Sequence, residues 1–121
     1  MIRKNISSGY AYEDVYGYSR AVRVGDQIHV SGTTASGADA YEQARAALSI
    51  IETALLEAGS SLTAVVRTVT YITDLADADP VARAHHEVFG NIRPAATLVG
   101  VTGLVGDNRL VEIEAYAIEP A

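Results

Sequence analysis

The sequence has 121 residues, a length typical of one domain, and 49% of them are apolar, which is enough to build a core. The net charge of −6 disfavours nucleic acid and anionic membrane surfaces as partners, because both are bound by basic patches. The lack of cysteine excludes disulfides, zinc–thiolate sites, iron–sulfur clusters and thiol catalysis. No long apolar run occurs, so we expect one cytoplasmic domain over residues 1–121 without a membrane span.

The first third of the chain predicts an irregular edge and then a hairpin. Ser, Gly and Tyr dominate residues 5–17, which indicates a loop, with a short N-terminal strand as an open alternative. Residues 18–24 and 27–31 have the composition of two strands. Gly25 and Asp26 between them form a two-residue hairpin signal of the Gly-X kind.

The clearest predicted element is a helix that begins at Asp39. Glu42 lies three residues later, which is the spacing of a capping box. Gly59 stands where a C-terminal cap is expected. The apolar stripe between them is narrow and rich in alanine, which indicates close packing on a sheet: Ala44, Ala47, Leu48, Ile51, Leu55 and Ala58.

The second half predicts a strand, a helix and two more strands. Residues 64–73 are dense in β-branched side chains and predict a strand, and an acidic loop follows. Asp79 as N-cap and Pro80 as first helical residue predict a helix that ends at Phe89. The stretch 93–117 has the pattern of two strands joined by a Gly/Asp/Asn turn, which we interpret as a hairpin.

The element order β-β-α-β-α-β-β predicts an α+β domain whose mixed sheet is covered by helices on one face. The strands carry Val and Ile on both sides. The uncovered face of the sheet is therefore expected to meet another subunit.

The last strand carries two carboxylates on one face. Alternation places Glu112 and Glu114 opposite Val111, Ile113 and Ala115. A strand this apolar buries a carboxylate when it has a partner or a task. From the residues alone, Glu112 is a water-positioning or proton-handling group, one half of an ion pair with an arginine, or simply exposed to solvent. Glu114 is interpreted as structural.

Taken together, several short motifs resemble the RidA/YjgF family of reactive-intermediate (enamine/imine) deaminases. Their order and spacing carry the resemblance along most of the chain: residues 17–22, 28–32, 58–59 and 65–69, then 74–75, Phe89, 93–95 and 111–115. The resemblance implies a chorismate-mutase-like α+β fold, with a mixed sheet and two helices packed on one face. It also implies a homotrimer with small-molecule sites in clefts between adjacent subunits.

The resemblance assigns roles to individual residues. Glu112 corresponds to the glutamate that positions a water for attack on the imine. Tyr18 corresponds to a cleft tyrosine, and Ser31 and Gly32 to a Ser-Gly pair whose backbone lines the cleft. The arginine that holds the substrate carboxylate is replaced by Ala96. The chain thus resembles a divergent member of the family, for which a substrate without an α-carboxylate is the better expectation.

Other candidates complete the predicted cleft. Thr33 can donate to a small polar ligand, Thr97 and Leu98 flank Ala96, and His85 can act as a base or donor near neutral pH. For each of them an ordinary loop, interface or helix-face role is the alternative. Four arginines could supply the missing cation from elsewhere, although each has a surface or interface ion pair as its alternative: Arg20, Arg67, Arg83 and Arg93.

No cofactor or metal site is expected. The adjacent His85 and His86 point about 100° apart on a helix and cannot easily share one metal ion. Two functions follow from the sequence. The first is a deaminase-type hydrolase for imines, enamines or other small C–N metabolites, and the second is a non-catalytic metabolite-binding or regulatory module on the same trimer.

Overall fold

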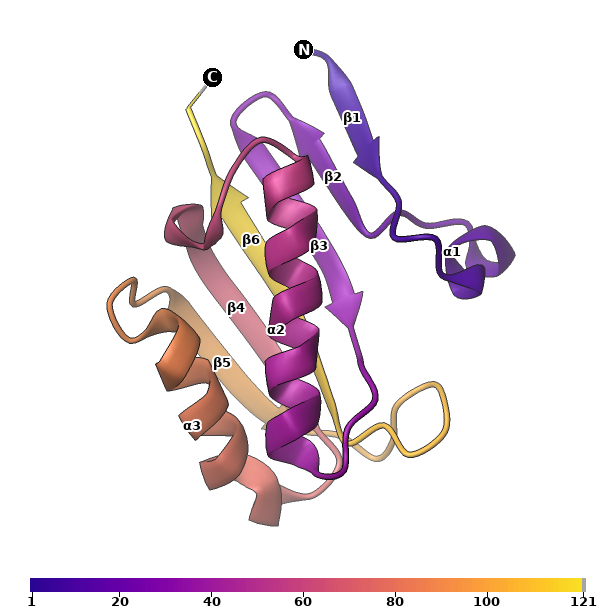
Figure 1. The fold of residues 1–121 in the computed structure, drawn as a ribbon, viewed down its shortest axis with the longest axis vertical. Coiled ribbons are helices and arrows are strands. Elements are labelled where there is room, and N and C mark those ends of the chain that lie inside the picture. Colours follow the sequence, from indigo (N-terminus) through magenta and orange to yellow (C-terminus); the bar gives the residue numbers. More distant parts are fainter. Residues whose placement is uncertain (121) are drawn as a thin grey trace.

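A six-stranded sheet with two long helices on one face forms the protein (Figure 1). The structure, a computed structural model, describes residues 1–120. In chain order its helices and strands are β1 (Arg3–Ile6), α1 (Ala11–Tyr16), β2 (Ala21–Val24), β3 (Gln27–Thr33), α2 (Ala40–Glu57), β4 (Val65–Ile72), α3 (Ala78–Phe89), β5 (Ala95–Gly100) and β6 (Val111–Ile118). Short 3₁₀ turns, Leu62–Ala64 and Leu75–Asp77, precede β4 and α3.

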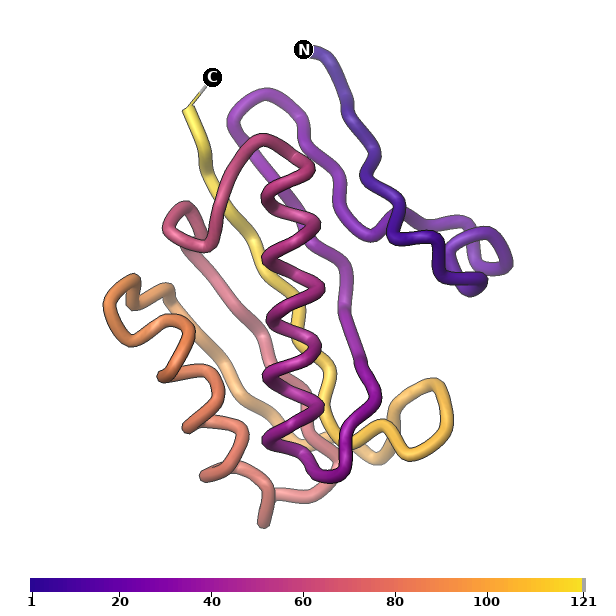
Figure 2. Tube along the Cα trace, viewed as in Figure 1, coloured from indigo at the N-terminus to yellow at the C-terminus, as the bar shows by residue number. Residues whose placement is uncertain are grey.

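The sheet is mixed, as predicted. Its strand order is β1-β2-β3-β6-β4-β5, and every neighbouring pair is antiparallel except β4 and β5. Figure 2 shows the last strand, in yellow, running between the purple and pink strands in the middle of the sheet. The C-terminal strand is therefore central, whereas β1 and β5 are the edges.

The predicted hairpin of the two last strands is wrong. β5 pairs with β4 in parallel, and β6 pairs with β3 and β4. Residues 101–110 therefore form a crossover past β4 rather than a tight turn. Turn residues mark where a chain bends, but they do not determine which strand it pairs with afterwards.

Helix α2 confirms the predicted caps. The Asp39 side chain accepts a hydrogen bond from the Glu42 N–H at 2.8 Å. At the other end Gly59 has a φ of +83°, and the amides of Gly59 and Ser60 bond back to Leu56 and Leu55. This pattern is a Schellman motif, which the left-handed glycine permits. All six residues of the predicted apolar stripe are buried.

Two other expectations need correction. Residues 11–16 form the helix α1 instead of a loop, although the short strand β1 does precede it. Helix α3 begins at Ala78, one residue before the predicted N-cap. Pro80 is then the third residue of the helix, still within the first turn where no intrahelical N–H bond is required.

The two faces of the sheet differ in chemistry. On β6 the predicted inner residues are buried under the helices: Val111, Ile113, Ala115 and Ala117. Glu112, Glu114 and Tyr116 are half-buried and point the other way. We call the first side the helix face and the second the open face.

Candidate functional site

Glu112 is a half-buried carboxylate on the open face, and it lies against glycine. A Cβ atom added to Gly32 would stand 2.3 Å from its Oε2. Among the described residues Glu112 makes no side-chain hydrogen bond and no ion pair within 4.0 Å. Its oxygens are therefore available to an external group.

A β-bulge brings Gly32 to this position. In the pairing of β3 with β6, Val30 opposes Ala115 and Thr33 opposes Ile113, so two residues of β3 face one residue of β6. The extra residue lies in the Ser31–Gly32 pair. Bulges bend a strand and redirect its groups, and they are frequent beside active sites.

Arg20 organises the same region from the residues that precede β2. Its side chain is 3% exposed. Its Nη1 donates to the Gly32 carbonyl at 3.1 Å and to Thr33 Oγ1 at 2.7 Å, and its Nη2 donates to the Tyr18 hydroxyl at 3.3 Å. Its Nε is buried without a hydrogen-bond partner among the described residues. One guanidinium thus joins three of the residues predicted for the cleft.

The electrostatics of Glu112 follow from this neighbourhood. Burial raises the pKa of the Glu112 carboxyl, the Arg20 guanidinium opposes that rise, and the nearby Glu114 adds to it. Burial disfavours the charged form of an acid, whereas a cation stabilises it. A carboxyl poised in this way can exchange a proton closer to neutral pH than an exposed glutamate.

Glu114, two residues further along the same face, has a different environment. Its carboxylate accepts hydrogen bonds from the Tyr71 hydroxyl at 2.6 Å and from the Tyr116 hydroxyl. The bond to Glu114 raises the pKa of Tyr71 to about 12. Because these internal partners satisfy Glu114, its environment agrees with a structural role.

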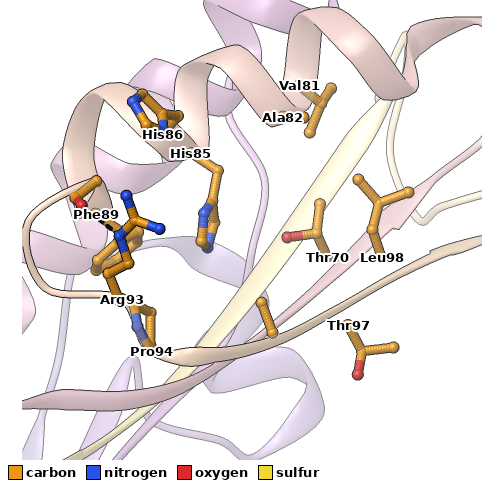
Figure 3. A pocket seen from close by; sticks show the side chains of 12 residues that line it. Thr70, Val81, Ala82, His85, His86, Phe89, Arg93, Pro94, Thr97 and Leu98 are labelled. Carbon is orange, nitrogen blue, oxygen red and sulfur yellow. Dashed lines mark hydrogen bonds between the residues drawn. The ribbon is translucent and has the colours of Figure 1, made fainter.

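A second concave feature lies on the helix face, between α3 and β5 (Figure 3). This α3–β5 pocket has a volume of about 420 Å³ and is lined mainly by apolar side chains. Val81 and Phe89 come from α3, and Ala96 and Leu98 from β5. The volume falls in the range of small-molecule sites.

His85 projects from α3 into this pocket. One of its ring nitrogens, Nε2, is 2.8 Å from the hydroxyl of the buried Thr68, and its ring lies 4.7 Å from that of Phe89. Burial lowers the pKa of the His85 imidazole, and the adjacent His86 lowers it further. The imidazole is thereby held neutral near pH 7, oriented by one hydrogen bond.

The predicted site residues thus fall into two groups. Tyr18, Gly32 and Glu112 lie around Arg20, and we call these four residues the carboxylate half-site. Ser31 and Thr33 support it internally, because the Ser31 hydroxyl donates to the Ser19 carbonyl and Thr33 is fully buried. Four others line the α3–β5 pocket: His85, Ala96, Thr97 and Leu98.

One chain cannot bring the two groups together. Ala96 belongs to the helix face of β5, and Glu112 to the open face of β6. β4 lies between the two strands, which separates them by about 10 Å across the sheet.

Sequence reasoning underestimated two arginines. Arg20 and Arg93 were candidates for the missing cation, with an ordinary ion pair favoured for each. Arg20 is instead buried at the carboxylate half-site, and Arg93 lines the α3–β5 pocket. The Arg20 position, two residues after Tyr18, was an available signal, because the alternation of a strand places both on one side.

The comparison with known proteins is decisive about the family. Residues 10–119 match the family model described as Endoribonuclease L-PSP. The crystal structure of Rv2704 from Mycobacterium tuberculosis, described as a member of the highly conserved YjgF/YER057c/UK114 family, matches with a TM-score of 0.95 and 48% identity. The match covers 97% of this chain and 99% of that one.

The chain belongs to the RidA/YjgF family.

Curated relatives extend this result. An uncharacterized protein of Streptomyces coelicolor is 37% identical, over 93% of this chain and 91% of its own. A bovine 2-iminobutanoate/2-iminopropanoate deaminase is 33% identical, over 98% of this chain and 92% of its own. The predicted family and α+β fold are therefore confirmed for this RidA/YjgF protein.

Residues 1–120 contain neither a candidate membrane span nor a candidate metal cluster. None of their helices has the length and hydropathy needed to cross a bilayer. No three of their His, Asp and Glu side chains gather closely enough to hold a metal ion.

Proposed function

We propose that this RidA/YjgF protein hydrolyses small imines or enamines in a cleft that two copies of the chain form together. The observation that carries the proposal is the contrast between neighbouring carboxylates. Glu114 is bound by two tyrosine hydroxyls, whereas Glu112 is half-buried against Gly32 with its oxygens unused. A carboxylate kept in this state is costly unless an external group binds it.

The reaction needs one proton carrier and one water. The Glu112 carboxylate accepts a proton from the water as its oxygen bonds to the imine carbon and the C=N electron pair moves to nitrogen. Glu112 then returns the proton to nitrogen, which gives a carbinolamine. It next takes the proton of the new hydroxyl and passes it to the amine nitrogen, so that the C=O bond forms as the C–N bond breaks and ammonia leaves behind a carbonyl compound. An enamine first takes a proton on carbon to become the imine. Arg20 favours the ionised form of Glu112 in which the water is bound.

Exposure supports the assembly between copies. β5 is an edge strand, and its Leu98 and Val99 are 38% and 37% exposed. Edges with apolar side chains are usually covered by another chain. A second copy at this edge would set its carboxylate half-site against the α3–β5 pocket, as the homotrimer implied by the family resemblance requires.

A binding module without catalysis is the second candidate. Ala96 favours it, because the β5 wall of the pocket carries no charge where the resemblance implies an arginine. RNA cleavage, which the description of the family model names, is disfavoured by the net charge of −6.

The test uses freshly generated 2-iminobutanoate with the intact protein. We expect the wild-type chain to accelerate loss of the imine and Glu112→Gln to lose about 10²- to 10⁴-fold of that acceleration. Ala96→Arg should increase activity toward this carboxylate substrate. A wild-type protein that gives no acceleration at high concentration, yet whose melting temperature rises with small metabolites, would replace the enzyme by the binding module.

A further inference from the structure

The α3–β5 pocket differs in charge from the rest of the chain. The protein carries 15 acidic side chains against 9 basic ones. No Asp or Glu lines the pocket, yet Arg93, His85 and His86 do. Arg93 therefore makes the local charge positive, the reverse of the whole molecule.

Arg93 has an unusual backbone at this pocket. Its φ is +60°, a left-handed conformation that glycine and asparagine adopt more readily than arginine. Strained residues of this kind concentrate at functional sites, so the contacts of the Arg93 side chain are relevant to the function of the pocket.

The left-handed turn returns the side chain toward the helix. Arg93 lies outside β5, so the distance of about 10 Å that an extended strand would place between it and Ala96 does not apply. Both residues line the same pocket. In Figure 3 the Arg93 guanidinium lies at the same end of the pocket as the His85 ring.

One hydrogen bond orients the Arg93 guanidinium. Its Nε donates to the Gly90 carbonyl at 2.9 Å. Neither Nη group has a hydrogen bond or an ion pair with a described residue. Since guanidinium has five N–H donors in a planar fork, the unused edge can bind two oxygens of one anion.

The carbonyl end of α3 faces this region and by itself would repel an anion. The bond to Gly90 covers one of these carbonyls with the Arg93 cation. The remaining walls are apolar and suit a short carbon chain: Val81, Phe89, Ala96 and Leu98.

We propose that Arg93 is the anion-binding residue of the α3–β5 pocket, and that the ligand is a small carboxylate with a short apolar body. The charge missing at Ala96 is thus supplied from the turn before β5. The inference rests on the proposed function for the identity of the pocket as the ligand site. Anion binding itself requires no turnover and can be measured separately.

The experiment compares butyrate with butyramide, its uncharged analogue of similar shape, by NMR titration of the full-length protein. Arg93→Asn removes the charge with a residue that tolerates the left-handed backbone. Arg93→Lys keeps the charge but loses the planar fork. The matched control is Arg83→Asn, because Arg83 lies over the Tyr41 ring, outside the pocket, and carries the same charge.

We expect wild-type protein to bind butyrate more tightly than butyramide, with shifts at His85 and Leu98. Arg93→Asn should weaken butyrate about ten- to a hundredfold and leave butyramide unchanged. The butyrate affinity of Arg93→Lys should lie between those of the wild type and Arg93→Asn. The butyrate affinity of Arg83→Asn should match that of the wild type.

Equal binding of the two compounds by the wild type would overturn the inference, as would Arg93→Asn retaining full butyrate affinity. In the second case Arg93 only caps α3. Glu112→Gln separates the two proposals, since it should abolish hydrolysis and leave butyrate binding intact. Arg93-dependent binding without any hydrolysis would refute the enzyme and keep the anion site.

Discussion

The carboxylate half-site and the α3–β5 pocket differ in how they place charged and apolar groups. The half-site buries charge: Arg20 is 3% exposed, and the Glu112 carboxylate lies beside it without an internal partner. The pocket presents apolar surface, including the exposed Ala96 and Leu98, and its cation, Arg93, is also exposed at the end of α3. In the proposed function, the first region carries the proton chemistry and the second holds the small molecule.

The difference is the reason why we propose a site that two copies of the chain share. The half-site has a carboxylate whose oxygens have no partner among the described residues, and the pocket has a cavity whose lining contains no Asp or Glu. They occupy opposite faces of the sheet, two strands apart. Assembly of copies is therefore part of the proposed chemistry, and variants should affect the two regions separately.

After the loss of hydrolysis in Glu112→Gln, the largest expected effect comes from Gly32→Ala. The added Cβ would lie 2.3 Å from Glu112 Oε2 and must displace that carboxylate, which a flexible side chain permits without unfolding. We expect imine hydrolysis to fall about 10²-fold, as misplaced catalytic groups do, with butyrate binding unchanged. Gly103→Ala is the matched control, because nothing lies within 4 Å of its added Cβ. Equal rates for both variants would contradict the assigned role of Glu112.

Arg20→Gln should have the next largest effect. It removes a buried cation and its hydrogen bonds to Tyr18, Gly32 and Thr33. We expect a loss of about 2–4 kcal/mol in the free energy of unfolding, measured by urea denaturation.

The same variant should also raise the pKa of Glu112, because the guanidinium that opposes the effect of burial is gone. Carboxyl ¹³C titration checks the shift, and the acidic limb of hydrolysis should move to higher pH with it. Arg20→Lys should restore most of the original titration. An unchanged Glu112 titration in Arg20→Gln would show that the Arg20 charge does not affect the pKa of Glu112.

Tyr71→Phe tests whether Glu114, unlike Glu112, is held by internal hydrogen bonds. It removes one of the hydroxyls bonded to Glu114, and we expect a loss of about 1 kcal/mol of stability. The absorbance titration should lose the phenol whose pKa is about 12. Tyr12→Phe, on the exposed helix α1, is the control and should leave stability unchanged. A decrease in butyrate binding by Tyr71→Phe would show that the two regions are coupled.

The smallest expected effect is a gain of stability in Glu112→Gln. The folded-state pKa of Glu112 is raised, so its contribution to stability is full below the unfolded pKa and is lost as pH rises through the folded one. At pH 7 the glutamine variant should therefore melt roughly 2 °C higher than the wild type, and the difference should vanish toward pH 4. A lower melting temperature at pH 7 would mean that Glu112 has an internal structural partner.

Local patterns in the sequence predicted local structure well. The N-cap at Asp39, the stripe of α2 and the alternation of β6 each depend on spacing within one element, and all three are confirmed. The β5–β6 hairpin was wrong because pairing depends on long-range competition, which no turn residue encodes.

The candidate site shows the same division. Alternation placed Glu112 and Glu114 on one face, but it could not show that only Glu114 meets tyrosine hydroxyls, because Tyr71 lies on another strand. The position of the Gly32 carbonyl that Arg20 binds depends on a β-bulge. The direction of the Arg93 side chain depends on its own left-handed backbone. Both are backbone irregularities, which periodicity does not reveal.

The central claim is that Glu112 of one copy works with the α3–β5 pocket of another. Glu112→Gln removes the carboxylate, and Ala96→Trp fills the pocket, so each variant alone should be inactive. The two variants are unfolded together in equal amounts and refolded. If the protein forms the homotrimer that the family resemblance implies, random assembly restores about a quarter of the wild-type sites. Activity near that level is the predicted result of this mixing measurement. An inactive mixture, from subunits shown to co-assemble, would contradict the shared site.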